Sequence, residues 1–77
     1  MEKLKTYEKR LKQIGEKLKD LRLKAGYKSA ETFSYDNELN RVQYWRMEKG
    51  ANFTLTSLFK ILEIHKITLE EFFARIK

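Results

Sequence analysis

Residues 29–50 of the chain read SAETFSYDNELNRVQYWRMEKG. Ser29 and Asn40 belong to the residue types that cap helix N-termini, and Gly50 suits the left-handed position that follows a helix. These signals predict two short helices joined by a tight turn, the first running from Ser29 to about Asn37 and the second from Asn40 to just before Gly50.

The second of these helices has two distinct faces. At about 100° per residue, Tyr44 and Met47 fall together on an apolar side that predicts contact with a core. The opposite side carries four residues, Arg41, Val42, Trp45 and Arg46. Arginine can donate to two acceptors of guanine at once, and valine can pack on a thymine methyl group, so this face has the chemistry to read DNA. Trp45 either packs on sugar and backbone or on a neighbouring subunit, or it packs against the preceding helix or the loop after Gly50.

Upstream, a helix is predicted from about Lys3 to Lys24, ended by Gly26. Its apolar residues recur at alternating spacings of three and four, at Leu4, Tyr7, Leu11, Ile14, Leu18 and Leu21. The second half of this seam is expected to enter the core. The first half extends beyond what a small core needs, so it either packs on a second subunit or folds back on its own domain. Gly15 lies within the helix and weakens it by roughly 1 kcal/mol relative to alanine.

Downstream, Thr54 is the expected cap of a fourth helix, whose apolar positions are dense enough to be largely buried: Leu55, Leu58, Phe59, Ile61, Leu62 and Ile64. Thr68 and Glu71 have the spacing of a capping box that opens a fifth helix, and Asn40 and Gln43 have the same spacing. The fifth helix carries the apolar residues Leu69, Phe72, Phe73 and Ile76. With five helices and no strand signal, the sequence predicts an all-α fold.

The 77 residues suffice for one small domain, with residues 1–13 expected as a helical extension and residues 14–77 as the domain itself. The net charge is +6, and ten of the 17 basic residues fall in residues 1–28. Residues 29–50 hold three basic and four acidic residues. The basic first helix is therefore either a surface that attracts a polyanion such as nucleic acid or a solvated lysine-rich face.

The run from Ile14 to Phe73 resembles the phage-repressor helix-turn-helix family, also called Cro/cI-like or XRE. The resemblance is carried by the segments IGEKLKDLR (14–22), AGYKS (25–29), RMEKG (46–50), LFKIL (58–62) and ITLEEFF (67–73). The interval from Ser29 to Gly50 also has the usual length of that family. No single segment is specific, but their order and spacing together are.

This resemblance implies a five-helix phage-repressor-like fold with an N-terminally extended first helix, in which residues 41–48 lie in the major groove. It implies base contacts by Arg41, Val42 and Arg46, with Trp45 on the same outer surface. The positions that match phosphate contacts are Lys28, Ser29, Asn40, Gln43, Lys49 and Asn52. The implied function is sequence-specific binding of double-stranded DNA by a transcriptional regulator, as a homodimer on a two-fold site.

Four positions depart from the family pattern. Ala30 stands where the family often has glutamine, which removes a common phosphate and base-edge contact. Asn37 and Glu38 replace the usual leucine and glycine of the turn, and Lys66 replaces a glycine after the fourth helix. Because a non-glycine residue at positive φ is unfavourable, we expect the turn to be reshaped or the second helix to be extended.

Other chemistry has little support in the sequence. There is no cysteine and one histidine, so neither a metal site nor a cofactor is expected, and no enzyme motif is present. His65 is expected to be packed or placed at a helix C-terminus, and Glu48 to form an ion pair near Arg46 and Lys49. Neither a secretory signal nor a membrane span is recognisable, so a cytoplasmic location is expected.

The main alternative to a simple regulator is an antitoxin, which binds a toxin protein as well as its own promoter. The partner surface would be either the seam of Leu4, Tyr7 and Leu11 or the aromatic group Phe53, Phe72 and Phe73. A third possibility, a basic amphipathic helix lying on anionic lipid, is disfavoured because the first helix also carries acidic residues and its apolar stripe is needed by the domain.

Overall fold

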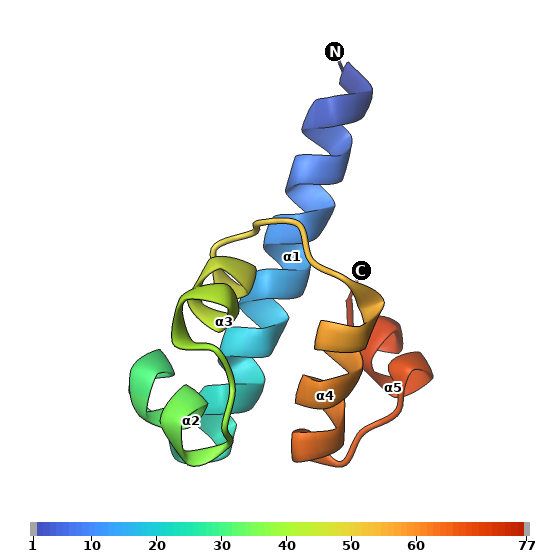
Figure 1. Ribbon diagram of the computed structural model, residues 1–77. Helices are drawn as coiled ribbons and strands as arrows, with labels where there is room; N and C mark the ends of the chain where they lie inside the picture. The colour runs from blue at the N-terminus through green and yellow to red at the C-terminus, as the bar shows by residue number, and fades with distance from the viewer. Residues whose placement is uncertain (1, 77) are drawn as a thin grey trace.

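The computed structural model describes the backbone of residues 2–76 and the side chains of residues 6–76. It contains five helices, α1 (Glu2–Lys24), α2 (Ala30–Asp36), α3 (Arg41–Glu48), α4 (Leu55–His65) and α5 (Leu69–Ala74) (Figure 1). No strand occurs in the described part of the chain, so the prediction of an all-α, five-helix fold is confirmed. No helix within residues 2–76 is both long enough and apolar enough to cross a lipid bilayer.

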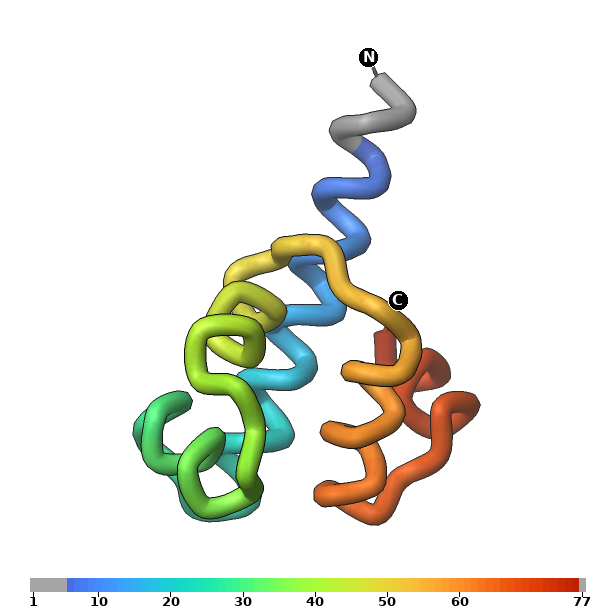
Figure 2. The backbone as a smooth tube through the Cα atoms, in the orientation of Figure 1, coloured from blue at the N-terminus to red at the C-terminus, as the bar shows by residue number. Residues whose placement is uncertain are grey.

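Helix α1 forms the long axis of the molecule, and its N-terminal half rises above the other four helices (Figure 1). Helix α3 packs on α1, α2 contacts both of them, and α4 pairs with α5. The segment that leaves α3 crosses over α1 before it reaches α4 (Figure 2). A β-carbon built on Gly50 would meet the Lys12 side chain at 2.8 Å, which confirms the close crossing.

A single core draws on all five helices. Its buried members in the described part of the chain are Leu18, Leu21, Phe33, Tyr44, Met47, Leu58, Ile61, Leu62 and Phe72. The second half of the α1 seam therefore enters the core as predicted. In the first half, Tyr7 is 59% exposed and Leu11 is half-buried, while the side chain of Leu4 lies outside the described residues.

Four helices begin at the predicted caps. The side chains of Ser29, Asn40, Thr54 and Thr68 each accept a hydrogen bond from the backbone N–H three residues later. Thr68 and Glu71 complete a capping box. The box predicted for Asn40 and Gln43 is wrong, because the Gln43 amide donates instead to the Ser57 hydroxyl at 2.9 Å.

Helix α4 is less buried than its composition suggested. Leu55 and Phe59 are 59% and 48% exposed, so the expectation of a largely buried helix is wrong at these two positions. They are four residues apart and share a face, whereas Leu58, Ile61 and Leu62 occupy the face that meets the core. The remaining position, Ile64, is half-buried against the core.

The turn between α2 and α3 keeps its left-handed residue although no glycine is present. Glu38 adopts φ 56°, in the left-handed region, and helix α2 ends at Asp36, so the expected extension of α2 is not found. The Leu39 N–H donates to the Ser34 carbonyl at 2.8 Å and the Glu38 N–H to the Tyr35 carbonyl at 3.3 Å, which is a Schellman motif. These bonds form with any residue at the left-handed position and offset part of its conformational cost.

The same pair of hydrogen bonds closes three other helices, at Gly26 after α1, Gly50 after α3 and Lys66 after α4. Lys66, at φ 57°, repeats the solution found at Glu38. A non-glycine residue in the left-handed conformation costs roughly 1–2 kcal/mol at each of these two positions.

Gly15 sets the distance between α1 and α3. A β-carbon at this position would lie 2.5 Å from the carbonyl oxygens of both Met47 and Glu48, at the C-terminal end of α3. The glycine that weakens α1 as an isolated helix therefore permits the close packing of α3 on it. In the sequence, Gly15 is recognisable only as an isolated glycine in a helical pattern. That pattern does not identify α3 as the helix that packs against it.

A buried ion pair lies beside this crossing. Arg22 Nε and Nη2 donate to Glu48 Oε2 and Oε1 at 2.7 and 3.1 Å, and both side chains are only 5% exposed. Arg22 Nη1 also donates to the Tyr27 carbonyl at 2.9 Å. Glu48 forms an ion pair as expected, but its partner is Arg22 rather than the nearby Arg46 or Lys49, because its carboxylate turns inward to α1. Hydrogen bonding to Glu48 raises the pKa of Arg22 above its usual range.

His65 ends α4 with a packed ring, as expected. The imidazole stacks on Phe33, with centroids 5.3 Å apart and planes 6° apart. Its Nε2 is buried and has no hydrogen-bond partner among the described residues. Burial lowers the pKa of His65, because the charged imidazolium would lose hydration without gaining a partner.

The Gly15→Ala variant is expected to lose up to about 2 kcal/mol of unfolding free energy. The new methyl group would force α3 away from α1, and this overpacking outweighs the roughly 1 kcal/mol gained in helix propensity. Urea denaturation measures the change, and Glu16→Ala, an exposed position of α1, is the control expected to stay close to wild type. A Gly15→Ala protein that is more stable than wild type would contradict the assigned role of the contact.

The unfolding free energy should fall as the pH is lowered from about 7 to about 5. The folded pKa of His65 lies below its unfolded value of about 6.5, so the unfolded chain binds the extra proton first and stability is lost in this window. His65→Leu removes the titrating group and should flatten the profile over this range. Denaturation series at several pH values test this, and an equally steep profile in both proteins would contradict it.

Candidate nucleic-acid interface

The outer face of α3 is formed by the four side chains predicted for it. Val42 and Trp45 are 49% and 51% exposed, and Arg41 and Arg46 are exposed as well. On the opposite face Tyr44 and Met47 are buried in the core. The division into an inner and an outer face therefore agrees with the helical geometry inferred from the sequence.

Arg41 is held by α2 at one side of this face. Its Nη1 donates to Glu31 Oε2 at 2.9 Å, and the bond joins the first turn of α2 to the first turn of α3. Both side chains are well exposed, so the pair adds little to the free energy of folding. Its effect is to favour one orientation of the guanidinium, which sequence reasoning did not anticipate.

Trp45 stands between two surface hollows. One has a volume of about 240 Å³ and is lined by Ala30, Glu31, Arg41, Val42 and Trp45. The other, of about 330 Å³, brings Trp45 together with Lys19, Ser29 and Lys49, among other residues. The Lys49 ammonium lies 5.6 Å from the centroid of the Trp45 ring. The Trp45 side chain therefore lies beside Ala30 of α2, and about half of it remains exposed to solvent.

The predicted phosphate-contacting residues fall into separate groups. Ser29 and Lys49 lie on the α1 side of Trp45, in the hollow that also contains Lys19. Asn40 and Gln43 lie at the start of α3, on the side that faces α4. The remaining two residues, Lys28 and Asn52, are exposed in the loops before α2 and after α3. The structure therefore brings four of the six residues together in two pairs.

Several of these side chains already make hydrogen bonds within the chain. The oxygens of Ser29 and Asn40 cap their helices, and Asn52 Oδ1 accepts from the Phe53 N–H at 2.9 Å. In these capping bonds the oxygens act as acceptors, so the NH₂ groups of Asn40 and Asn52 and the Ser29 hydroxyl hydrogen remain as donors for a phosphate oxygen.

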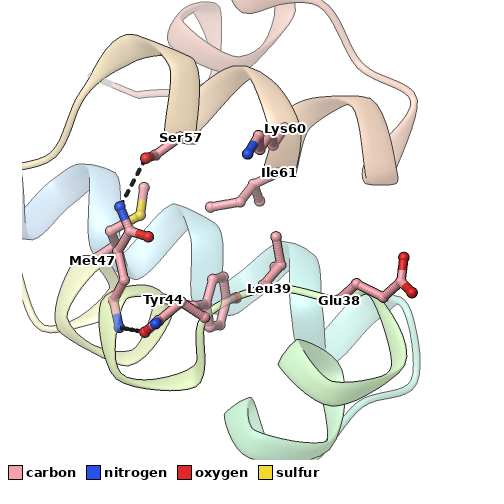
Figure 3. A pocket seen from close by; sticks show the side chains of 9 residues that line it. Glu38, Leu39, Tyr44, Met47, Ser57, Lys60 and Ile61 are labelled. Carbon is pink, nitrogen blue, oxygen red and sulfur yellow. Dashed lines mark hydrogen bonds between the residues drawn. The ribbon is translucent and has the colours of Figure 1, made fainter.

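A pocket of about 160 Å³ lies between the start of α3 and α4 (Figure 3). Glu38, Asn40, Gln43, Ser57 and Lys60 supply its polar lining, and the Gln43–Ser57 hydrogen bond spans it. Lys60 was not among the predicted residues. The one available signal was that Lys60 is the single lysine or arginine of α4.

Lys19 is the second basic residue that sequence reasoning missed. It is one of several lysines in α1, and only the packing of α3 determines which of them faces the candidate interface. Together with Lys49 on one flank and Lys60 on the other, it places positive charge on both sides of the outer face of α3. No group of three or more metal-ligating side chains occurs among the described residues.

Comparison of the chain with models of protein families, with curated proteins and with solved structures found no match in any of the three.

Proposed function

We propose that this protein is a sequence-specific double-stranded DNA-binding transcriptional regulator of the phage-repressor helix-turn-helix type. The observation that carries the proposal is the outer face of α3, which exposes two arginines, a valine and a tryptophan on a helix whose opposite face is locked into the core. An α-helix fits the major groove of B-DNA, where each base pair presents a distinct pattern of donors, acceptors and methyl groups.

The way α3 is held supports this role. The Gly15 contact and the Arg22–Glu48 pair both act at the C-terminal end of α3, and the Asn40 cap acts at its start. A reading helix needs such support, because side chains that are already oriented lose less entropy when they bind. Arg41 and Arg46 would donate to guanine, and Val42 would pack on a thymine methyl group.

The basic residues on the two flanks of α3 would contact the phosphates on either side of the groove. Lys19 and Lys49 serve one flank, and Lys60 with the amides of Asn40 and Gln43 serves the other. Lys28, Ser29 and Asn52 extend these contacts through the loops. Such contacts fix the register of the protein on the duplex without reading its sequence. A cytoplasmic location is part of the same proposal.

We further propose that the protein binds as a homodimer through the projecting half of α1. Tyr7 and Leu11 continue the apolar seam beyond the core, and Tyr7 is largely exposed. Two copies of α3 on a two-fold site would combine two modest affinities into one strong interaction.

The double variant Arg41→Ala, Arg46→Ala should lose discrimination between a selected site and a scrambled duplex. Each arginine–guanine contact contributes about 1–3 kcal/mol, so each single variant should lose roughly 5- to 150-fold in preference. The site is obtained by selection from a random duplex library at near-physiological salt, and the readout is competition binding.

Arg75→Ala, which also removes one positive charge but lies on the far end of the chain, is the control and should retain the preference. A uniform loss of affinity on all duplexes in the arginine variants would assign these residues to phosphate contacts alone. Selection that enriches no motif would overturn sequence-specific binding itself.

The double variant Tyr7→Asp, Leu11→Asp should be monomeric and should bind a single half-site weakly. Sedimentation velocity with and without DNA measures the oligomeric state. Lys9→Asp changes the charge by the same amount on the opposite face of α1 and should remain dimeric. Dimerisation that survives the double variant would place the interface elsewhere.

An antitoxin is the second candidate, favoured by the exposed apolar side chains of α4 and α5. Leu55, Phe59 and Phe73 are all at least 41% exposed and could contact a protein partner, as could the half-buried Phe53. Phe72, which had been grouped with them, is fully buried and is excluded from such a surface. The Arg41 and Arg46 variants should leave binding to such a partner intact.

A further inference from the structure

The hollow between α2 and the outer face of α3 has a composition that points to a particular group on DNA. Its walls are the methyl group of Ala30, the side chain of Val42 and one face of Trp45, and most of its lining is apolar. Its volume of about 240 Å³ is more than a methyl group requires, and it opens on the same side of the molecule as the outer face of α3.

Two charged residues also line the hollow. They are Arg41 and Glu31, and the exposed bond between Arg41 Nη1 and Glu31 Oε2 favours a guanidinium position beside the apolar lining. A guanidinium carries five N–H donors, so a bond to Glu31 leaves donors for two further acceptors. Glu31 cannot itself attract a phosphate, and its charge is matched by Arg41.

The major groove offers few groups that fit an apolar hollow. The C5-methyl group of thymine is the one apolar group among the base edges, and a methyl group at C5 of cytosine occupies the same place. A bidentate arginine, by contrast, selects the O6 and N7 acceptors of guanine. A hollow and an arginine side by side therefore match a C5-methylated pyrimidine next to a guanine.

We propose that this hollow is a subsite for the C5-methyl group of a pyrimidine that neighbours a guanine read by Arg41, and that Glu31 is a positioning residue for that arginine. The inference rests on the proposed DNA-binding function and specifies what one part of the interface reads. Ala30 is essential to it, because a longer side chain at the start of α2 would fill the hollow.

The test uses the full-length protein and the duplex selected from the random library. Each thymine of the site is replaced in turn by 2′-deoxyuridine, which removes the C5-methyl group and keeps the base pair. At one thymine adjacent to a guanine, affinity should fall about fourfold, the effect of one buried methyl group. Ala30→Gln should abolish this difference between thymine and uracil, whereas Thr56→Gln, an exposed position on α4, should preserve it.

A second arm replaces that thymine–adenine pair by cytosine–guanine, with and without a methyl group at cytosine C5. Tighter binding of the methylated duplex extends the subsite to 5-methylcytosine, and equal binding restricts it to thymine. Glu31→Gln should weaken the preference for the neighbouring guanine while the thymine-to-uracil effect persists. If Glu31→Gln instead abolished the difference between thymine and uracil and left the preference for the neighbouring guanine unchanged, the role given to Glu31 would be overturned.

The methyl subsite is overturned if uracil at every position binds as tightly as thymine while the protein still prefers its site to a scrambled duplex. That result would leave the proposed function standing. Absence of any site preference is a different result, and it would overturn both.

Discussion

The close crossing of α1 and α3 is the constraint on which the rest of the structure depends. Gly15 lets the last carbonyl groups of α3 approach the α1 backbone, and the buried Arg22–Glu48 pair joins the two helices next to that contact. An ion pair taken out of water costs desolvation, which its attraction offsets only when its hydrogen bonds are well formed. Here the guanidinium makes two bonds to the carboxylate and a third to the Tyr27 carbonyl, so the geometry meets that condition.

The residues around this α1–α3 contact also connect the core with the outer face of α3. Tyr44 lies in the core with its hydroxyl close to Arg22 and Glu48, and burial, followed by the neighbouring Glu48, raises the pKa of its phenol. Phe33 packs on Tyr44 and brings α2 to the same cluster. In this way α2 and α3 are held in position relative to α1. On the protein surface, the bond between Glu31 and Arg41 joins α2 to α3, whose inner faces are already packed in the core.

Much of the fold could be predicted from local signals. The four cap residues, the burial of Tyr44 and Met47 and the exposed face of α3 depend on contacts within a few residues, or on the helical repeat, and all are confirmed. The partner of Glu48 could not be predicted, because Arg22 is 26 residues away and a nearer arginine was equally plausible. The exposure of Leu55 and Phe59 was missed for a related reason, since composition does not determine which face of a largely apolar helix meets the core.

The residues of the candidate site also fall into two groups, those that local signals predict and those that only the packing of distant helices brings together. Arg41, Val42, Trp45 and Arg46 follow from the periodicity of one helix, whereas Lys19 and Lys60 join the site only because α1 and α4 pack beside α3. The hollow at Ala30 also needs two helices to form. The turn also differs from the expectation, because Glu38 adopts the left-handed conformation and the Schellman hydrogen bonds close α2 at Asp36 without extending it.

The two faces of α3 have a consequence for how such a protein evolves. The residues that anchor the helix and those that face outward are different residues, and substitutions at exposed positions usually change stability by less than about 0.5 kcal/mol. Arg41, Val42 and Arg46 can therefore be exchanged one at a time without passing through an unfolded intermediate. The contacts that hold the scaffold, at Gly15 and in the Arg22–Glu48 pair, involve none of these exposed side chains.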